Sequence, residues 1–325
     1  MKKLLFLSFA LIGFLVSCDS DGSQDVSMEQ SEQKSAELKM VEIDLGGFTL
    51  GKSNGTAFKG GSDFQSGVAE LNEKLAAHGL QLEKMEVYSA DAAGQTVFFS
   101  DRGNKQLDSD YVPNDPRNIG GTTVPFIIDG TEKITSTGFD TEPALLTVRE
   151  TWENVTCSDG LEIPYLGNTP FDAGYVQNVF GFGGSPGFFP GAIVQAGVLP
   201  QAFFDFLGGG TSILGVCFTL TYIEDINGDG TGDVALKEIY YNDFFDWQDR
   251  VATGEGFDFQ TVALHETGHA LSQAHFGKVS RTDKNGKIHF SPRAVMNAGY
   301  SGVNRVIAKT DRAGHCSNWG NWPNN

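Results

Sequence analysis

Residues 265–269 read His-Glu-Thr-Gly-His, a short stretch whose residue types and spacing could hold a metal ion. If the stretch is helical, positions four apart lie on one face, so the imidazoles of His265 and His269 can bind the same zinc ion. Glu266 lies beside them and can take a proton from a water molecule on that zinc. The same pattern also occurs by chance in helices with two ordinary surface histidines, so the neighbouring sequence has to decide.

A third histidine, His275, follows His269 after six residues. On a continuous helix its side chain would point about 120° away, so it can reach the same zinc only if the helix ends between them. No glutamate follows Glu266, which excludes a downstream glutamate as third ligand. Weaker candidates remain, namely Asp283, His289, Asp311 and His315.

The pattern from His265 to His275 resembles the zinc signature of the metzincin metallopeptidases, in which glycine stands at the position of Ser272. The resemblance implies a sharp turn with positive φ at this position, which would cost a serine about 1 kcal/mol. Residues 294–300, Ala-Val-Met-Asn-Ala-Gly-Tyr, resemble the Met-turn of the same family. The resemblance implies that Met296 forms an apolar floor beneath the histidines. It also implies that Tyr300, which has the spacing of the matrixin branch, borders the substrate pocket with Met296.

The resemblance implies an α+β fold, with a metzincin-like catalytic domain over residues 119–325. That domain would contain a twisted mixed sheet, the zinc helix, the Met-turn and a C-terminal helix. The implied activity is that of a zinc endopeptidase, in which a zinc-activated water attacks a peptide bond and Glu266 serves as general base and then acid. A protein or peptide substrate would pair with an edge strand at residues 238–241. Residues 278–290 are expected to form a hairpin, an insertion relative to typical matrixins.

Residues 225–233, Asp-Ile-Asn-Gly-Asp-Gly-Thr-Gly-Asp, resemble a calcium-binding loop. Oxygen ligands at alternate positions and a glycine at the sixth position suit a hard cation such as Ca²⁺. The predicted ligands are Asp225, Asn227, Asp229 and Asp233. The EF-hand glutamate at position 12 is replaced by Leu236, and Glu238 is the nearest substitute. The alternative is an acidic turn that binds no ion.

The composition is that of a folded, acidic protein. Of the 325 residues, 40% are hydrophobic, and 23 Lys+Arg stand against 41 Asp+Glu, which gives a net charge of −18. A nucleic-acid-binding surface needs a dense basic face, so nucleic acid is excluded as a partner. We expect a soluble monomeric domain outside the cytoplasm.

The N-terminal 18 residues are typical of a bacterial lipoprotein signal peptide. Two lysines precede an apolar run, residues 4–16, which is too short to span a membrane. The sequence Leu-Val-Ser-Cys at residues 15–18 resembles a lipobox, which implies lipidation of Cys18 and a membrane anchor. Residues 19–40 are polar and acidic and are expected to be a flexible tether. The resemblance places the protein on the outer membrane or cell surface of a diderm bacterium; an ordinary secretory signal is the alternative.

Residues 41–118 are expected to form a small α/β domain, either a removable prosegment or a permanent accessory domain. Apolar residues at helical spacing predict a helix near residues 64–78, and strands follow at 80–87 and 96–99. No cysteine lies between Cys18 and Cys157, so an inhibitory prosegment would need a carboxylate to block the metal. The available aspartates are Asp101, Asp108, Asp110 and Asp115.

In the second domain the pattern predicts a helix at 141–154 and strands at 122–128, 161–163, 213–223 and 238–241, with mostly loop over 174–210. A short helix at 199–207 and a last helix from about 310 complete the elements. Besides Cys18 the chain has Cys157, Cys217 and Cys316, which predicts one disulfide and one free thiol without choosing the pair. A different class of function remains open, namely a lipid-anchored binding protein with a non-catalytic metal site.

Overall fold

The computed structural model describes residues 39–50, 62–90, 92–99, 109–249, 256–284 and 286–324. The predicted signal peptide with Cys18, nearly all of the predicted tether, Asp101 and Asp108 lie outside these residues. Residues Ala36–Asn325 form one of two compact units of the chain, and all that follows concerns this unit. Within its described part, no helix has both the length and the apolar character that crossing a membrane requires.

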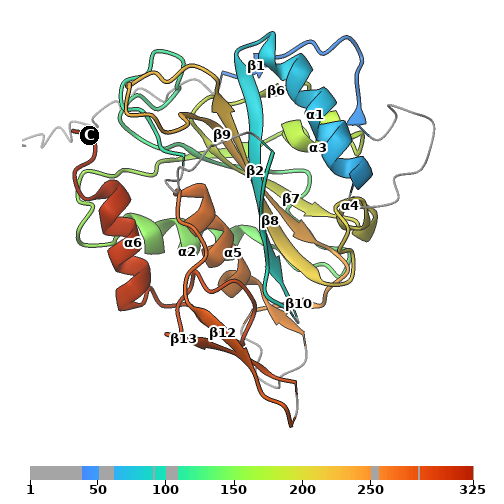
Figure 1. Ribbon diagram of the computed structural model, residues 1–325, viewed down its shortest axis with the longest axis vertical. Coiled ribbons are helices and arrows are strands. Elements are labelled where there is room, and N and C mark those ends of the chain that lie inside the picture. Colours follow the sequence, from blue (N-terminus) through green and yellow to red (C-terminus); the bar gives the residue numbers. More distant parts are fainter. Residues whose placement is uncertain are drawn as a thin grey trace, which may run out of the picture. The chain divides into compact units, whose positions relative to one another are not determined.

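A seven-stranded mixed sheet forms the centre of this unit, with the strand order β3-β2-β8-β9-β7-β4-β5 (Figure 1). Four neighbouring strands, β9, β7, β4 and β5, are parallel, whereas β8 is antiparallel to β9 and β2 is antiparallel to β8. The strands are β2 (Leu80–Ser89), β3 (Thr96–Phe98), β4 (Phe126–Asp129), β5 (Tyr165–Thr169), β7 (Ile193–Leu199), β8 (Ile213–Tyr222) and β9 (Val234–Asn242).

Helices cover both faces of the sheet, and the described residues contain six of them (Figure 1). One apolar core lies between the sheet and α1 (Ser62–Ala76), α3 (Tyr175–Phe180) and α4 (Gln201–Phe206). The other lies between the sheet and α2 (Glu142–Glu153), α5 (Phe259–Ala270) and α6 (Lys309–Trp319). β8 is buried throughout because both of its faces are covered, which explains its nearly continuous apolar sequence.

Three short strand pairs lie outside this sheet. They are β1 (Val41–Glu42) with β6 (Gly187–Phe188), β10 (Trp247–Gln248) with β11 (Phe257–Asp258), and β12 (Lys278–Arg281) with β13 (Ile288–Ser291). The last pair is the hairpin predicted between His275 and Met296; Asn285, in its predicted turn, lies outside the described residues.

The mixed α+β class agrees with the prediction, but two strand assignments differ. β7, a buried central strand, lies in the range expected to be mostly loop. Its glycine, Gly197, suggests a turn, yet the structure uses it for a positive φ of 114° against the backbone of Glu132. The prediction of a strand at 161–163 is also wrong, because pairing with β4 begins only at Tyr165.

The strand predicted to be an exposed edge is internal. β9 pairs with β8 on one side and with β7 on the other, so residues 238–241 offer no free edge to a substrate. The neighbour of β8 on its far side is β2, which comes from the range predicted to be a separate N-terminal domain. The predicted boundary near residue 118 therefore does not coincide with a break between compact units.

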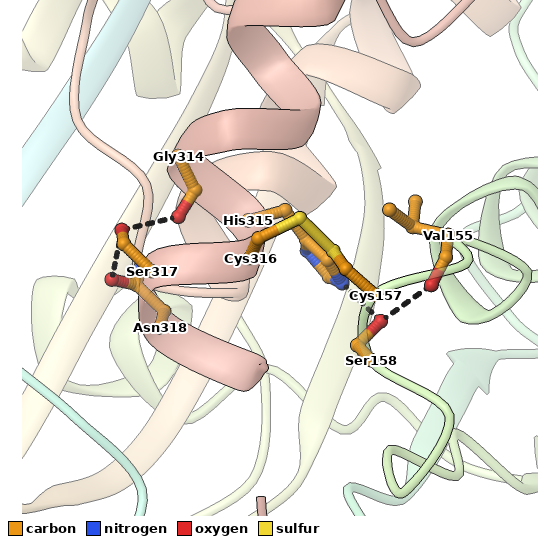
Figure 2. The surroundings of a disulfide bond; sticks show 8 residues. All are labelled: Val155, Cys157, Ser158, Gly314, His315, Cys316, Ser317 and Asn318. Carbon is orange, nitrogen blue, oxygen red and sulfur yellow. Dashed lines mark hydrogen bonds between the residues drawn. A yellow bond between two sulfur atoms is a disulfide. The ribbon is translucent and has the colours of Figure 1, made fainter. Parts of the chain in front are cut away.

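One disulfide joins two distant segments, as Figure 2 shows. Cys157, just after α2, is bonded to Cys316 in α6, whereas Cys217 on β8 is a buried free thiol. Beside the disulfide, Ser158 Oγ lies 2.9 Å from His315 Nε2. The pairing that the sequence left open is thus one that fixes α6 against the end of α2.

Candidate metal centre

The helix that carries the metal-binding pattern, α5, begins at a clear N-cap. Asp258 accepts a hydrogen bond from the backbone N–H of Thr261 at 2.8 Å, and the guanidinium of Arg305 pairs with the same carboxylate. The helix is buried on nearly all sides, between the sheet and α2. It ends at Ala270, before His275, as the reach of a third histidine requires.

The turn after α5 depends on Ser272, which has a φ of 61°. The backbone N–H of Gln273 then donates to the carbonyl of Gly268 at 3.0 Å, which closes the helix end and reverses the chain. The hydroxyl of Ser272 is buried and has no hydrogen-bond partner in the described part of the chain. The expected positive φ is therefore present, on a residue that adopts it less readily than glycine.

The side chains of His265, His269 and His275 converge. His269 Nε2 lies 2.9 Å from His265 Nε2 and 3.1 Å from His275 Nε2. Among the described residues, this triad is the one group of three or more histidine, cysteine or acidic side chains whose ligand atoms all lie within 4.8 Å of one another.

The orientation of two rings shows why a cation fits here. His265 Nδ1 lies 2.7 Å from the carbonyl oxygen of Val295, and His269 Nδ1 lies 2.7 Å from that of Gln273. A neutral ring that donates from Nδ1 keeps a lone pair on Nε2, so lone pairs face one another across the cluster. Such an arrangement is repulsive when empty and is the usual donor set for zinc.

Burial keeps the rings of His265 and His275 uncharged. It lowers the pKa of His265 well below its usual value, and the neighbouring His269 and His275 lower it further. Burial, together with His269, lowers the pKa of His275 to about 3. Neutral imidazoles are the form that binds a metal ion.

Glu266 lies fully buried beside the cluster. Neither of its carboxylate oxygens has a hydrogen-bond partner among the described residues. Burial, and then the charge of Glu86, raise its pKa well above the usual value. Gly215 on β8 makes room for it, because a Cβ atom there would lie 3.0 Å from Glu266 Oε1.

The predicted Met-turn lies under the helix. Met296 is buried against Gly268 of α5, where even a Cβ atom would collide with its sulfur. Asp311 of α6 accepts the backbone N–H groups of Val295 at 2.9 Å and of Met296 at 3.0 Å. The same segment supplies the Val295 carbonyl to His265, so α6 and the Met-turn orient a candidate ligand.

Tyr300 lies beside the centre rather than in it. Its hydroxyl accepts the backbone N–H of Asp258 at 3.2 Å, at the start of α5. Its ring borders a cavity of about 640 Å³, together with Ala90 after β2 and Ile288 of the hairpin. This position suits the predicted border of a pocket.

Two residues of β2 reach the centre, and the sequence analysis did not find them. The ring of Tyr88 stacks on His265 with centroids 3.9 Å apart, and Glu86 Oε1 lies 3.2 Å from His269 Nδ1. Lys84 pairs with the other oxygen of Glu86 at 3.0 Å. Although burial opposes it, the neighbouring His269 and Lys84 hold the pKa of Glu86 well below its usual range. The available signal was the run of charged residues inside a strand that is otherwise apolar.

The weaker ligand candidates are occupied elsewhere. His289 contacts Thr282 in the hairpin, His315 contacts Ser158, and Asp311 holds the Met-turn. Asp283 is exposed. Of the aspartates proposed to block the metal, Asp115 pairs with Arg117, and Asp110 lies at the acidic loop. Within the range predicted to be a prosegment, the carboxylate next to the histidines is that of Glu86 instead.

The predicted calcium loop is held by its own backbone. Asp225 accepts the N–H groups of Gly228 and Gly230 at 2.7 and 2.9 Å, and Asp229 accepts that of Thr231 at 2.7 Å. Asn227 accepts the N–H of Asp229.

Two further carboxylates border this loop. Asp233 accepts the N–H of Ile226, and Asp110 accepts the hydroxyl of Thr231 at 3.0 Å. Burial, and then Asp229, raise the pKa of Asp110 to about 7. The prediction that Glu238 replaces the missing glutamate ligand is wrong, because Glu238 is buried and accepts the N–H groups of Tyr175 and Val176 instead.

Comparison with known proteins adds no assignment to this geometry, since no protein-family model matches the chain and no curated protein is significantly similar to it.

Proposed function

We propose that this protein is a zinc-dependent endopeptidase of the metzincin type. One observation carries the proposal: three imidazoles meet around a point while the carboxylate of Glu266 lies beside them, buried and without a hydrogen-bond partner among the described residues. A structural zinc site has four protein ligands and needs no acid or base, whereas a catalytic site keeps one position open.

The chain's own groups fit the roles that peptide hydrolysis requires. Zinc, when bound, would lower the pKa of a water molecule and polarise the scissile carbonyl. Glu266 would accept the proton at a carboxylate oxygen and deliver it to the leaving amine. Burial raises the pKa of Glu266 well above its usual value, which is the direction that suits a group that takes and then returns a proton. The carbonyls of Val295 and Gln273 would hold His265 and His269 in place.

The burial of all but His275 in the centre favours a second candidate. His265, Glu266 and His269 are all inaccessible to solvent in this structure. A lipid-anchored binding protein with a non-catalytic metal site would have this property.

The experiment that separates the two candidates compares Glu266→Gln with the parent chain. We expect one zinc per chain in both proteins and a loss of casein hydrolysis of about 10²- to 10⁴-fold in the variant. The matched control is Glu162→Gln, which changes an exposed carboxylate far along the sequence from the helix. Equal casein hydrolysis by Glu266→Gln and the parent would overturn the peptidase proposal.

We also propose a lipid anchor at Cys18, which would hold the enzyme at the outer membrane or cell surface with proteins or peptides as substrates. The support is the sequence of the first 18 residues alone. Metabolic labelling with a radioactive fatty acid should mark the parent chain and not Cys18→Ser; label on both would refute the anchor.

A further inference from the structure

Strand β2 occupies the one side of β8 that β9 leaves free. It pairs antiparallel with β8 from Leu80, opposite Tyr222, to Ser89, opposite Ile213. At its end, the carbonyl of Ser89 accepts the backbone N–H of Tyr300 at 2.9 Å. β2 is therefore held between β8 on one side and, on the other, the short strand β3 and the segment that follows the Met-turn, in the manner of an extended peptide added to a sheet.

The path of β2 passes directly over the candidate metal centre. Tyr88 stacks on His265 and Glu86 contacts His269, so these two side chains lie against the rings that would hold zinc. A substrate must bring its scissile carbonyl to the water molecule that the catalytic base activates, and this water lies within about 3 Å of the base. An extended chain cannot approach Glu266 along β8 while β2 is in this position.

The sequence of β2 is unusual for a strand that is only part of a core. Toward α5 it buries Lys84 and Glu86 as an ion pair with 1% and 0% of their side chains exposed. A buried ion pair stabilises a fold less than apolar side chains of similar size, because both charges lose their hydration. Both would regain water if β2 left, so this face of the strand detaches at a lower cost than an apolar face. The opposite face, with Met85 and Val87, is apolar and anchors the strand.

We propose that the free side of β8 is the binding surface for an extended peptide substrate, and that β2 is its built-in occupant. The inference rests on the proposed peptidase function. The structure is then a closed form, in which residues 80–89 must leave β8 before a substrate can bind. In this proposal strand β2, and not an aspartate, has the inhibitory role that was predicted for the N-terminal range.

The test loosens β2 and then locks it. Met85→Ala with Val87→Ala weakens the anchoring face without touching the metal centre. Gln81→Cys with Thr221→Cys, added to the same chain, joins β2 to β8, since these two residues are paired and their side chains lie 3.2 Å apart. Two rates are measured on zinc-loaded full-length chains: casein cleavage, and transfer of zinc to a chromogenic chelator.

Loosening should raise both rates at least tenfold, and the oxidised lock should return both to the parent level until a reductant is added. The unlocked loosened chain with the same reductant controls for the native disulfide. Val176→Ala with Val179→Ala, in the same core but in α3, controls for general destabilisation and should leave both rates unchanged.

Equal casein cleavage by the locked and unlocked chains would overturn the inference, because substrate would then bind with β2 in place. The same holds if the α3 control accelerates both rates as much as loosening does. A different result would address the proposed function alone: no cleavage by any chain, while the lock still slows zinc transfer, would refute the peptidase and keep β2 as the cover of the metal centre.

Discussion

The histidine centre and the acidic loop at residues 225–233 were both predicted as metal sites from residue types and spacing. The two differ in whether their candidate ligand atoms converge. At the first, the ligand atoms of three residues lie within 4.8 Å of one another and face a common point. At the second, Asp225, Asp229 and Asp233 accept backbone N–H groups of their own loop. No triad of that closeness forms there among the described residues.

The difference shows what spacing can determine. On a helix, spacing fixes the direction of each side chain, and contacts from elsewhere then hold the rings, here from Val295 and Gln273. In a loop, spacing fixes only the backbone turn, and the carboxylates remain free to pair with nearby N–H groups. We therefore expect a preorganised zinc centre and a calcium loop that completes itself only when the ion binds, with Asp110 as an additional ligand.

Removal of one histidine should have the largest effect. Loss of a hydrogen-bond partner behind a ligand costs about 10- to 100-fold in metal affinity, so loss of a ligand should cost more. We expect His275→Ala to lose its zinc in competition with a chelator, and His289→Ala, in the exposed hairpin, to keep it. Zinc affinity unchanged in His275→Ala would end the three-histidine assignment.

Calcium should stabilise the fold through the acidic loop. An ion that binds only the folded chain adds about 2.7 kcal/mol at a hundredfold excess over Kd. We expect the melting temperature of the calcium-free protein to rise with millimolar Ca²⁺, and the rise to disappear in Asp229→Ala and Asp110→Asn. A rise that survives both changes would place the ion elsewhere, and no rise in the parent would leave an acidic turn without an ion.

Substitution of Asp311 tests whether the Met-turn behind His265 supports zinc binding. It accepts the N–H groups of Val295 and Met296, so Asp311→Ala should loosen the Met-turn and lower zinc affinity by about 10- to 100-fold. Partial recovery in Asp311→Asn, which keeps a carbonyl acceptor, would support positioning. Full zinc affinity in Asp311→Ala would mean that the histidines converge without this support.

A glycine in the turn that positions His275 should stabilise the fold. Ser272 adopts a φ of 61°, which costs an L-residue about 1 kcal/mol, and its hydroxyl has no hydrogen-bond partner in the described chain. Ser272→Gly should therefore raise the free energy of unfolding by up to about 1 kcal/mol in denaturant titration, whereas Ser272→Ala keeps the strained φ and should not. A destabilised glycine variant would contradict this account.

The smallest effect concerns pH at the acidic loop. The pKa of Asp110 is raised from its ordinary 3.8 to about 7, so between these values the folded chain keeps a proton that the unfolded chain has released. The bound proton on Asp110 therefore adds to the free energy of unfolding below about pH 4, and this added stability is lost as pH rises through 7. Because Asp110 is partly exposed, we expect a loss under about 1 kcal/mol in chelator. Asp110→Asn should flatten this part of the profile; an unchanged slope would assign it to other carboxylates.

Local signals predicted the elements near the metal centre well. The helix that carries His265 and His269, its end before His275 and the positive φ at Ser272 all follow from residue types at fixed spacing. What failed depends on pairing between distant strands. β7 contains Gln195 and Gly197 and lies in a glycine-rich range that suggests a loop, and only its two neighbours in the sheet make it a strand.

The contacts of Glu86 and Tyr88 with the histidines were unpredictable for the same reason. They require β2 to pair with β8, more than 120 positions along the chain. The choice of Cys157 and Cys316 as the disulfide pair is equally non-local, since 159 residues separate them.

That disulfide makes the candidate centre dependent on its surroundings. By the chain-entropy argument, a cross-link that closes a loop of 159 residues stabilises the fold by up to about 5 kcal/mol, against a total of about 5–15 kcal/mol for a typical domain. The helix that it secures, α6, carries Asp311 and so supports the Met-turn behind His265. In a reducing compartment this support would weaken, and the protein would hold its metal poorly until it reached an oxidising one. Formation of the disulfide would then be a precondition for tight metal binding.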